Sequence, residues 1–144
     1  MKWIDKNLHI TPITKHIDPY KPVENAIITH GHADHAKPGH KNVLATSETI
    51  EIMKIRYGEN CAENFQVLPT NQSLKINDVL IKFFPAGHIL GSVQVLTEYK
   101  GEKINFTGEL FNKLGYFVKN NLVFQETVCK QSIKSSLGRF YPYV

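Results

Sequence analysis

The amino-acid sequence predicts a mixed α/β (α+β) fold in a single domain. Two observations lead to this prediction: short apolar runs that are typical of buried strands, and one segment with helical periodicity and helix-capping residues. The polar stretches that carry candidate ligands follow directly after apolar runs, as is usual in α/β proteins. With 144 residues, of which 42% are hydrophobic, the chain can bury one ordinary core.

In the first half of the chain, residues 26–28 and 43–46 are expected to form short buried strands. A helix is expected to begin at the N-cap residue Ser47, with acidic side chains in its first turn, and to end at Gly58. Its apolar side chains recur on one face, which predicts a packing role and no chemistry. Residues 1–24 contain three prolines and are expected to form loops or edge strands.

From residue 65 onward the pattern becomes strand-like. Turn signals occur at residues 77–78 and at residues 100–102, and the second of these is typical of a hairpin. The expected strands are residues 65–68, 73–76, 79–84, 92–96 and 103–107. Residues 65–107 are therefore expected to form mainly β-structure.

The stretch from Thr29 to His35 contains three histidines and one aspartate within six residues. Imidazole and carboxylate groups are natural ligands of a borderline metal such as zinc. His30 and His32 lie two residues apart, so in an extended segment they point the same way, while Asp34 and His35 follow at once. One loop could therefore supply ligands to two metal ions, which dinuclear hydrolases hold roughly 3.5–4 Å apart.

A second candidate ligand, His88, stands in a glycine-containing stretch that follows an apolar strand. Together with His30 and His32 it would complete a three-histidine site that leaves a position open for water. The glycines on either side of His88, at positions 87 and 91, would let the backbone approach a metal closely.

Composition limits the other possibilities. No apolar run approaches the roughly 20 residues that cross a bilayer, and the start of the chain lacks the apolar core of a signal peptide, so a cytoplasmic location and no membrane contact are expected. The net charge of +4 permits a polyanionic partner without demonstrating one. Cys61 and Cys129 match no metal or redox spacing and are expected to be free thiols. His9, His16 and His40 are expected to be surface or half-buried residues.

The two motifs together resemble the metallo-β-lactamase superfamily. Residues 30–35 (His-x-His-x-Asp-His) match its histidine motif. Residues 86–92 (Ala-Gly-His-x-Leu-Gly-Ser) resemble the β-CASP nuclease branch, which includes RNA 3′-end processing endonucleases and bacterial ligase-associated DNA exonucleases. Residues 17–23 and 57–59 also look like this nuclease branch, within which the ligase-associated exonucleases are the most similar group. The resemblance covers about residues 16–109 and implies a metallo-β-lactamase-like αββα sandwich, of which this chain resembles only the first αβ half.

The resemblance implies ligands for two zinc ions. The first zinc would be bound by His30, His32 and His88. The second would be bound by Asp34 and His35. Asp18 would be a supporting carboxylate that orients the histidine loop through hydrogen bonds.

The resemblance aligns Glu109 with a family aspartate that bridges both metals, and Glu109 is therefore also a candidate metal ligand, although its extra methylene displaces the carboxylate. Beyond it, residues 110–144 do not match the family. This segment is interpreted as a divergent or truncated C-terminal part, and the β-CASP domain is absent from the chain as given. The expected organisation is therefore an N-terminal metallo-β-lactamase-like half over residues 1–109, followed by that segment.

The leading hypothesis is zinc-dependent phosphodiester hydrolysis, in which a dinuclear metal site activates water. Asp34 would orient the attacking hydroxide, and replacement of His32 by alanine is expected to abolish hydrolysis. The implied substrate is nucleic acid in DNA repair or RNA processing, with an association with DNA ligase as one option. The sequence does not distinguish DNA from RNA or exonuclease from endonuclease action.

Two other hypotheses remain open from the sequence. The same fold could hydrolyse a thioester or lactam, because the histidine motif is common to the whole superfamily. The chain could instead be a non-catalytic fragment, or could depend on a second chain that supplies the missing half.

Overall fold

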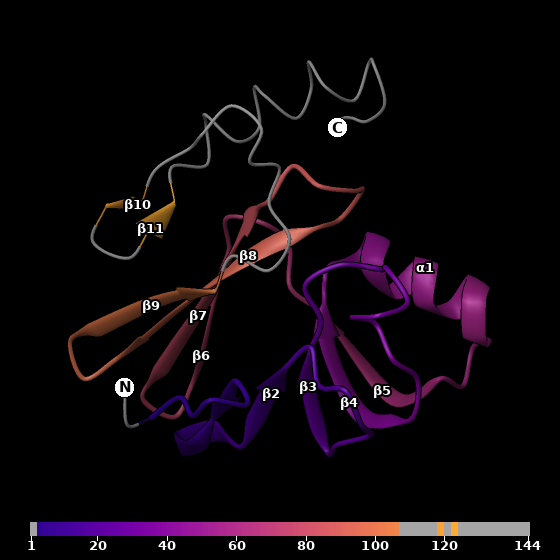
Figure 1. The fold of residues 1–144 in the computed structure, drawn as a ribbon, viewed down its shortest axis with the longest axis horizontal. Helices are drawn as coiled ribbons and strands as arrows, with labels where there is room; N and C mark the ends of the chain where they lie inside the picture. The colour runs from indigo at the N-terminus through magenta and orange to yellow at the C-terminus, as the bar shows by residue number, and fades with distance from the viewer. Residues whose placement is uncertain (1–2, 107–117, 120–121, 124–144) are drawn as a thin grey trace.

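The computed structural model describes residues 3–106, 118–119 and 122–123, which form two larger β-sheets, one two-stranded β-sheet and one α-helix (Figure 1). The first sheet has the strand order β1-β2-β3-β4-β5. Its strands are β1 (His9–Ile10), β2 (Lys15–Ile17), β3 (Asn25–Ile27), β4 (His40–Ala45) and β5 (Ala62–Val67). Strands β2 to β5 are parallel to one another, and β1 pairs antiparallel with β2.

The second sheet is antiparallel throughout, with the order β6-β7-β8-β9. Its strands are β6 (Ser73–Ile76), β7 (Val79–Pro85), β8 (Val93–Tyr99) and β9 (Glu102–Phe106). The remaining elements are the 3-10 helix η1 (Thr11–Ile13), helix α1 (Ser47–Tyr57) and the short antiparallel pair β10 (Val118–Lys119) and β11 (Leu122–Val123).

Successive residues of β3 and β4 face opposite sides of the first sheet, and both sides are buried. Ile27 and Leu44 face the second sheet and pack there with Phe83 of β7. Ala26 and Val43 face the other way, toward α1. Helix α1, the first sheet and the second sheet therefore form successive layers in the described part of the chain, as in a partial αββα sandwich (Figure 1).

This arrangement confirms the predicted mixed α/β fold. The expected strands and the hairpin turn at residues 100–102 are present, with ends displaced by no more than three residues. The helix ends at Gly58 as predicted, but its N-cap is Thr46 and not Ser47. The reason is that Thr46 keeps an extended backbone and its hydroxyl accepts a hydrogen bond from the amide of Thr49.

The expectation of loops or edge strands for residues 1–24 holds for β1, which lies at the edge of the first sheet, but not for β2, and the expectation of an accessible His40 was wrong. Strand β2 lies inside the first sheet, between β1 and β3, because the prolines at positions 12, 19 and 22 fall outside its three residues. His40, the first residue of β4, is only 1% exposed. Its burial is tolerated because its Nδ1 atom accepts a hydrogen bond from the amide of Val23. Burial lowers the pKa of His40. His9 and His16 are half-buried, as expected.

Cys61 is a buried free thiol, as predicted, whereas Cys129 lies outside the described residues. The expected division of the chain at residue 109 also falls outside them and stays a prediction. None of the helices in the described ranges has the length and apolar character needed to span a membrane.

Gly91 provides a test of how tightly the β7–β8 loop is held against α1. A Cβ atom at this position would lie 2.7 Å from the Cβ of Glu48, which cannot swing away because it is bonded directly to the helix backbone. We expect Gly91→Ala to lower the free energy of unfolding by about 1–2 kcal/mol for its left-handed backbone and by a further 1–3 kcal/mol or so for the collision. Urea unfolding of the wild-type protein and the variant measures the sum of the two costs.

Gly101 is the matched control, because its φ of +80° equals that of Gly91 within one degree and no atom lies within 4 Å of its Cβ position. Gly101→Ala should show the backbone cost alone. Equal destabilisation of the two variants would contradict the tight packing of the loop against α1.

Candidate metal centre

The histidine loop connects β3 to β4 and begins where β3 leaves the sheet. The amide of Ile28 still donates to the carbonyl of Leu44, so the first loop residue continues the sheet. Further along, the amides of His35 and Ala36 both donate to the carbonyl of His32, at 3.0 and 2.8 Å, and close one tight turn. This turn brings the end of the motif back beside its beginning.

The loop that carries His88 connects β7 to β8, and hydrogen bonds to Ser92 within the loop stabilise its conformation. The hydroxyl of Ser92 accepts hydrogen bonds from the amides of His88 and Ile89, at 3.1 and 3.2 Å. The next residue, Val93, donates its amide to the carbonyl of Thr29 at 2.9 Å. That hydrogen bond joins the two loops, so the edges of the two sheets meet at the histidines.

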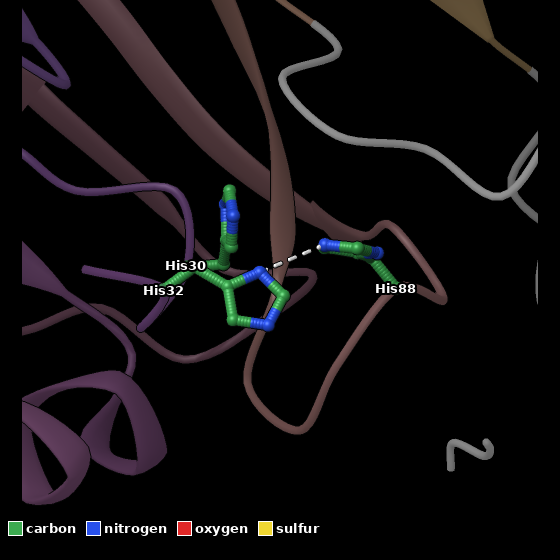
Figure 2. Close-up of side chains that lie close together, drawn as sticks. All are labelled: His30, His32 and His88. Carbon is green, nitrogen blue, oxygen red and sulfur yellow. Dashed lines mark hydrogen bonds between the residues drawn. The ribbon is translucent and has the colours of Figure 1, made fainter. Parts of the chain in front are cut away.

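Figure 2 shows the three imidazole rings of His30, His32 and His88 facing one another from these two loops. Their ring centroids lie 4.9–5.0 Å apart in all three pairs, with the rings nearly perpendicular to one another. One ring nitrogen from each histidine lies within 4.8 Å of the other two, and His88 Nε2 lies 3.2 Å from His32 Nδ1. Three imidazoles arranged in this way can hold one metal ion.

The burial of the cluster is graded. His30 is 1% exposed, His88 is half-buried and His32 is exposed, so the site opens to solvent on the side of His32. Burial, followed by the nearby charges of His35, His88 and His32, lowers the pKa of His30 to about 2. The imidazole of His30 is therefore neutral at physiological pH, as a metal ligand has to be.

The donor set fits a divalent metal ion. The Nε2 atom of His30 is buried and has no hydrogen-bond partner among the described residues, and a buried polar atom is costly to leave in this state. A coordinated ion would satisfy this atom. Nitrogen ligands of this kind suit zinc and related transition metals.

Behind the cluster, the nearly buried carboxylate of Asp18 receives three hydrogen bonds. Its Oδ1 accepts from the amide of Thr29 at 2.8 Å, and its Oδ2 accepts from the hydroxyl of Thr29 at 2.6 Å and from His35 Nδ1 at 2.8 Å. Asp18, His30 and His35 also form a second group whose candidate ligand atoms lie within 4.8 Å of one another. The carboxylate thus connects the end of β2 to both ends of the histidine motif.

The structure brings together most of the residues singled out from the sequence. His30, His32 and His88 form one group, and Asp18 and His35 adjoin it. Asp34 is 78% exposed in its side chain and belongs to neither group; its Oδ2 lies 3.7 Å from His35 Nε2. Glu109 lies outside the described residues.

Helix α1, to which the sequence assigned only packing, also contacts the site. Arg56 donates from Nη1 to the carbonyl of Gly31, between the first two histidines. A Cβ at position 31 would lie 2.7 Å from Cγ2 of Ile52, so the loop can approach the helix only because residue 31 is glycine. The glycine in His-Gly-His was a visible signal of close approach, but nothing in the sequence indicated Arg56 as its partner.

The lowered pKa of His30 predicts how the metal-free protein responds to acid. Below pH 6.5 the unfolded chain takes up a proton at His30 that the folded chain excludes until about pH 2. The free energy of unfolding should therefore decrease as the pH falls from 6.5, by up to about 1.4 kcal/mol per pH unit for this one group. Urea unfolding at pH 7.5, 6.5 and 5.5, with a chelator present, measures the slope.

The pKa values of His16 and His40 are also lowered by burial, so they add to the same slope. The His30→Gln variant isolates the contribution of His30 and should have a shallower pH dependence than the wild-type protein. Parallel pH dependences for the two proteins would contradict the lowered pKa of His30.

No protein-family model matches the chain. An RNase J-like protein of Methanocaldococcus jannaschii is 30% identical over 109 residues, a match that covers 62% of this chain and 26% of that protein. A probable DNA ligase of Opitutus terrae is 32% identical over 96 residues, which cover 65% of this chain and 9% of the ligase. The chain thus spans about a quarter of the first relative and a smaller share of the second.

Among solved structures, the flavodiiron protein from Giardia intestinalis matches with a TM-score of 0.50 and 23% sequence identity. The match covers 66% of this chain and 24% of that protein. At this identity the likeness concerns the fold alone, and it agrees with the layers described above. The predicted metallo-β-lactamase-like fold, present in part, is confirmed.

Proposed function

Starting from the metallo-β-lactamase fold of this chain, we propose that it is a metal-dependent hydrolase of the β-CASP nuclease type whose substrate is a nucleic acid phosphodiester. The observation that carries the proposal is the convergence of His30, His32 and His88 from two separate loops. Both relatives have names that refer to nucleic acid, an RNase J-like protein and a probable DNA ligase, and this supports the choice of substrate.

In this proposal His30, His32 and His88 hold the first metal ion, and Asp34 and His35 contribute to a second. Bound zinc would supply a Lewis acid that polarises a phosphoryl oxygen and makes water a nucleophile near neutral pH. The buried ring of His30 anchors the site, whereas the exposed ring of His32 borders the side that a phosphate can reach. The exposed carboxylate of Asp34 can orient water and accept its proton there.

Surface features beside the loop suit a single-stranded nucleic acid. Tyr20 is 79% exposed, and Lys37 Nζ lies 5.0 Å from the centroid of its ring. Tyr20 comes two positions after Asp18, and Lys37 comes two positions after His35. Because Asp18 and His35 are hydrogen-bonded to each other beside the candidate metal centre, Tyr20 and Lys37 flank that centre. An exposed aromatic ring next to a cation can stack a base while the cation contacts a phosphate.

A cavity of about 380 Å³ lies between the start of α1 and the β7–β8 loop. Gly87 and Ile89, the chain neighbours of His88, are part of its lining, as is the 65% exposed Leu90. Space of this kind along the loop that carries His88 can take part of a bulky substrate.

The test uses the 144-residue chain. Elemental analysis should find zinc in the purified wild-type protein, and the protein should cleave end-labelled single-stranded DNA or RNA. His32→Ala should lower both zinc content and cleavage, the latter by more than about 100-fold, because even the loss of an outer hydrogen-bond partner costs about 10–100-fold. His9→Gln, a half-buried histidine outside the cluster, is the matched control and should leave both unchanged.

Undiminished cleavage by the His32→Ala variant would remove this site from consideration. Hydrolysis of a lactam such as nitrocefin, or of a thioester, without cleavage of nucleic acid would support the second enzymatic hypothesis. A folded wild-type protein that binds no zinc and cleaves none of these substrates would support the non-catalytic or partner-dependent alternative.

Binding of nucleic acid is tested separately at Tyr20. Tyr20→Ala should weaken binding of a fluorescent oligothymidine by about 1–3 kcal/mol, the usual contribution of one stacked base, whereas Tyr20→Phe should bind like the wild-type protein because it keeps the ring. Fluorescence anisotropy measures both affinities. The stacking role would be refuted by a phenylalanine variant as weak as the alanine variant, or by an alanine variant that binds normally.

A further inference from the structure

A chain of two hydrogen bonds links the carboxylate of Asp18 to the ring of His30 through the side chain of Thr29. Thr29 Oγ1 lies 2.6 Å from Asp18 Oδ2 and 2.9 Å from His30 Nδ1. Thr29 is fully buried, so water does not compete for its hydroxyl group. Thr29 stands directly before the histidine motif, and its position in the sequence alone indicates no separate role.

The direction of these hydrogen bonds follows from the available protons. A carboxylate only accepts hydrogen bonds, and a hydroxyl group has a single proton to donate. The hydroxyl of Thr29 gives its proton to Asp18 Oδ2, and it can then only accept from His30. The proton of the neutral His30 ring must therefore be on Nδ1, which leaves a lone pair on Nε2.

We propose that Thr29 is a positioning residue that holds His30 in the Nδ1-protonated tautomer, so that Nε2 is available to a metal ion. The Nε2 atom of His30 is one of four buried side-chain atoms that lack a hydrogen-bond partner among the described residues, and it is the one that belongs to the three-histidine group. The part of the inference that concerns metal binding rests on the proposed function, whereas the part that concerns the tautomer does not.

Two substitutions at position 29 separate the hydroxyl from the rest of the residue. Valine keeps the β-branched shape, and the backbone of residue 29 would still donate to Asp18 Oδ1 and accept from the amide of Val93. Thr29→Val therefore removes the hydroxyl with little other change, while Thr29→Ser retains it. If only the shape of the side chain mattered, Thr29→Val, which keeps that shape, would resemble wild type, and Thr29→Ser, which lacks the methyl group, would not.

Asp18→Asn gives the sharper test because it should reverse the direction of the two hydrogen bonds that link residue 18 to His30 through Thr29. The amide of Thr29 can only donate to Oδ1, whereas the two partners of Oδ2, Thr29 Oγ1 and His35 Nδ1, can each become acceptors, so the oxygen stays at Oδ1 and the new NH₂ group takes the place of Oδ2. That NH₂ group would donate one proton to His35 Nδ1 and the other to the hydroxyl of Thr29, which would then donate its own proton to His30 Nδ1. The ring would be forced into the Nε2-protonated tautomer, in which Nε2 cannot bind a metal without losing a proton.

The tautomers are read directly by two-bond ¹H–¹⁵N correlation spectra of the histidine rings in metal-free, chelator-treated protein. We expect wild type and Thr29→Ser to show His30 protonated on Nδ1, Thr29→Val to show a mixture of tautomers, and Asp18→Asn to show protonation on Nε2. A wild-type ring protonated on Nε2 would overturn the inference, as would an unchanged tautomer in Thr29→Val. The wild-type spectrum decides the first point even if a variant fails to fold.

Zinc affinity, measured by competition with a chromophoric chelator, tests the consequence. Thr29→Val should bind zinc about 10–100-fold more weakly than wild type, and Thr29→Ser should restore the affinity. Equal affinity of Thr29→Val and wild type would overturn the role in metal binding. If the wild-type tautomer is as inferred but the wild-type protein binds no zinc, the proposed function fails and the assignment of the tautomer stands.

Discussion

The buried carboxylate of Asp18 is the interaction on which the candidate metal centre depends. Burying a carboxylate is costly unless hydrogen bonds compensate for the lost water, and here three donors from the histidine loop do so. These donors belong to Thr29 and His35, near the two ends of the motif. The same hydrogen bonds that make the burial of Asp18 possible therefore fix the shape of the loop that carries the candidate ligands.

The second constraint is the close packing of both loops against helix α1. Gly31 of the histidine loop lies against Ile52, and its carbonyl accepts from Arg56 near the end of the helix. At the other end of the helix, the hydroxyls of Thr46 and Thr49 donate to the carbonyl of Gly91 in the His88 loop. The helix thus supports both loops of the candidate metal centre.

The histidines lie where the parallel and the antiparallel sheet meet. A parallel strand that ends in a loop directs the first ligands toward the second sheet, whose β7–β8 connection brings His88 from the opposite side. The hydrogen bond from Val93 to Thr29 fixes the distance between them. Since the core between the sheets includes Phe83, close to this edge, the position of His88 depends on ordinary apolar packing as well as on polar contacts.

The sequence by itself determined the mixed α/β fold, most strand positions and the three histidines that converge, because hydrophobic periodicity and ligand spacing are local properties of the chain. It did not determine the burial of His40, the interior place of β2, or the roles of Thr29 and Arg56. Those depend on contacts between residues far apart in the chain, such as Asp18 with Thr29 and Arg56 with Gly31. Only the tertiary structure decided which polar groups are buried together, and the need to pair buried donors with acceptors is what sets the order of protons in the site.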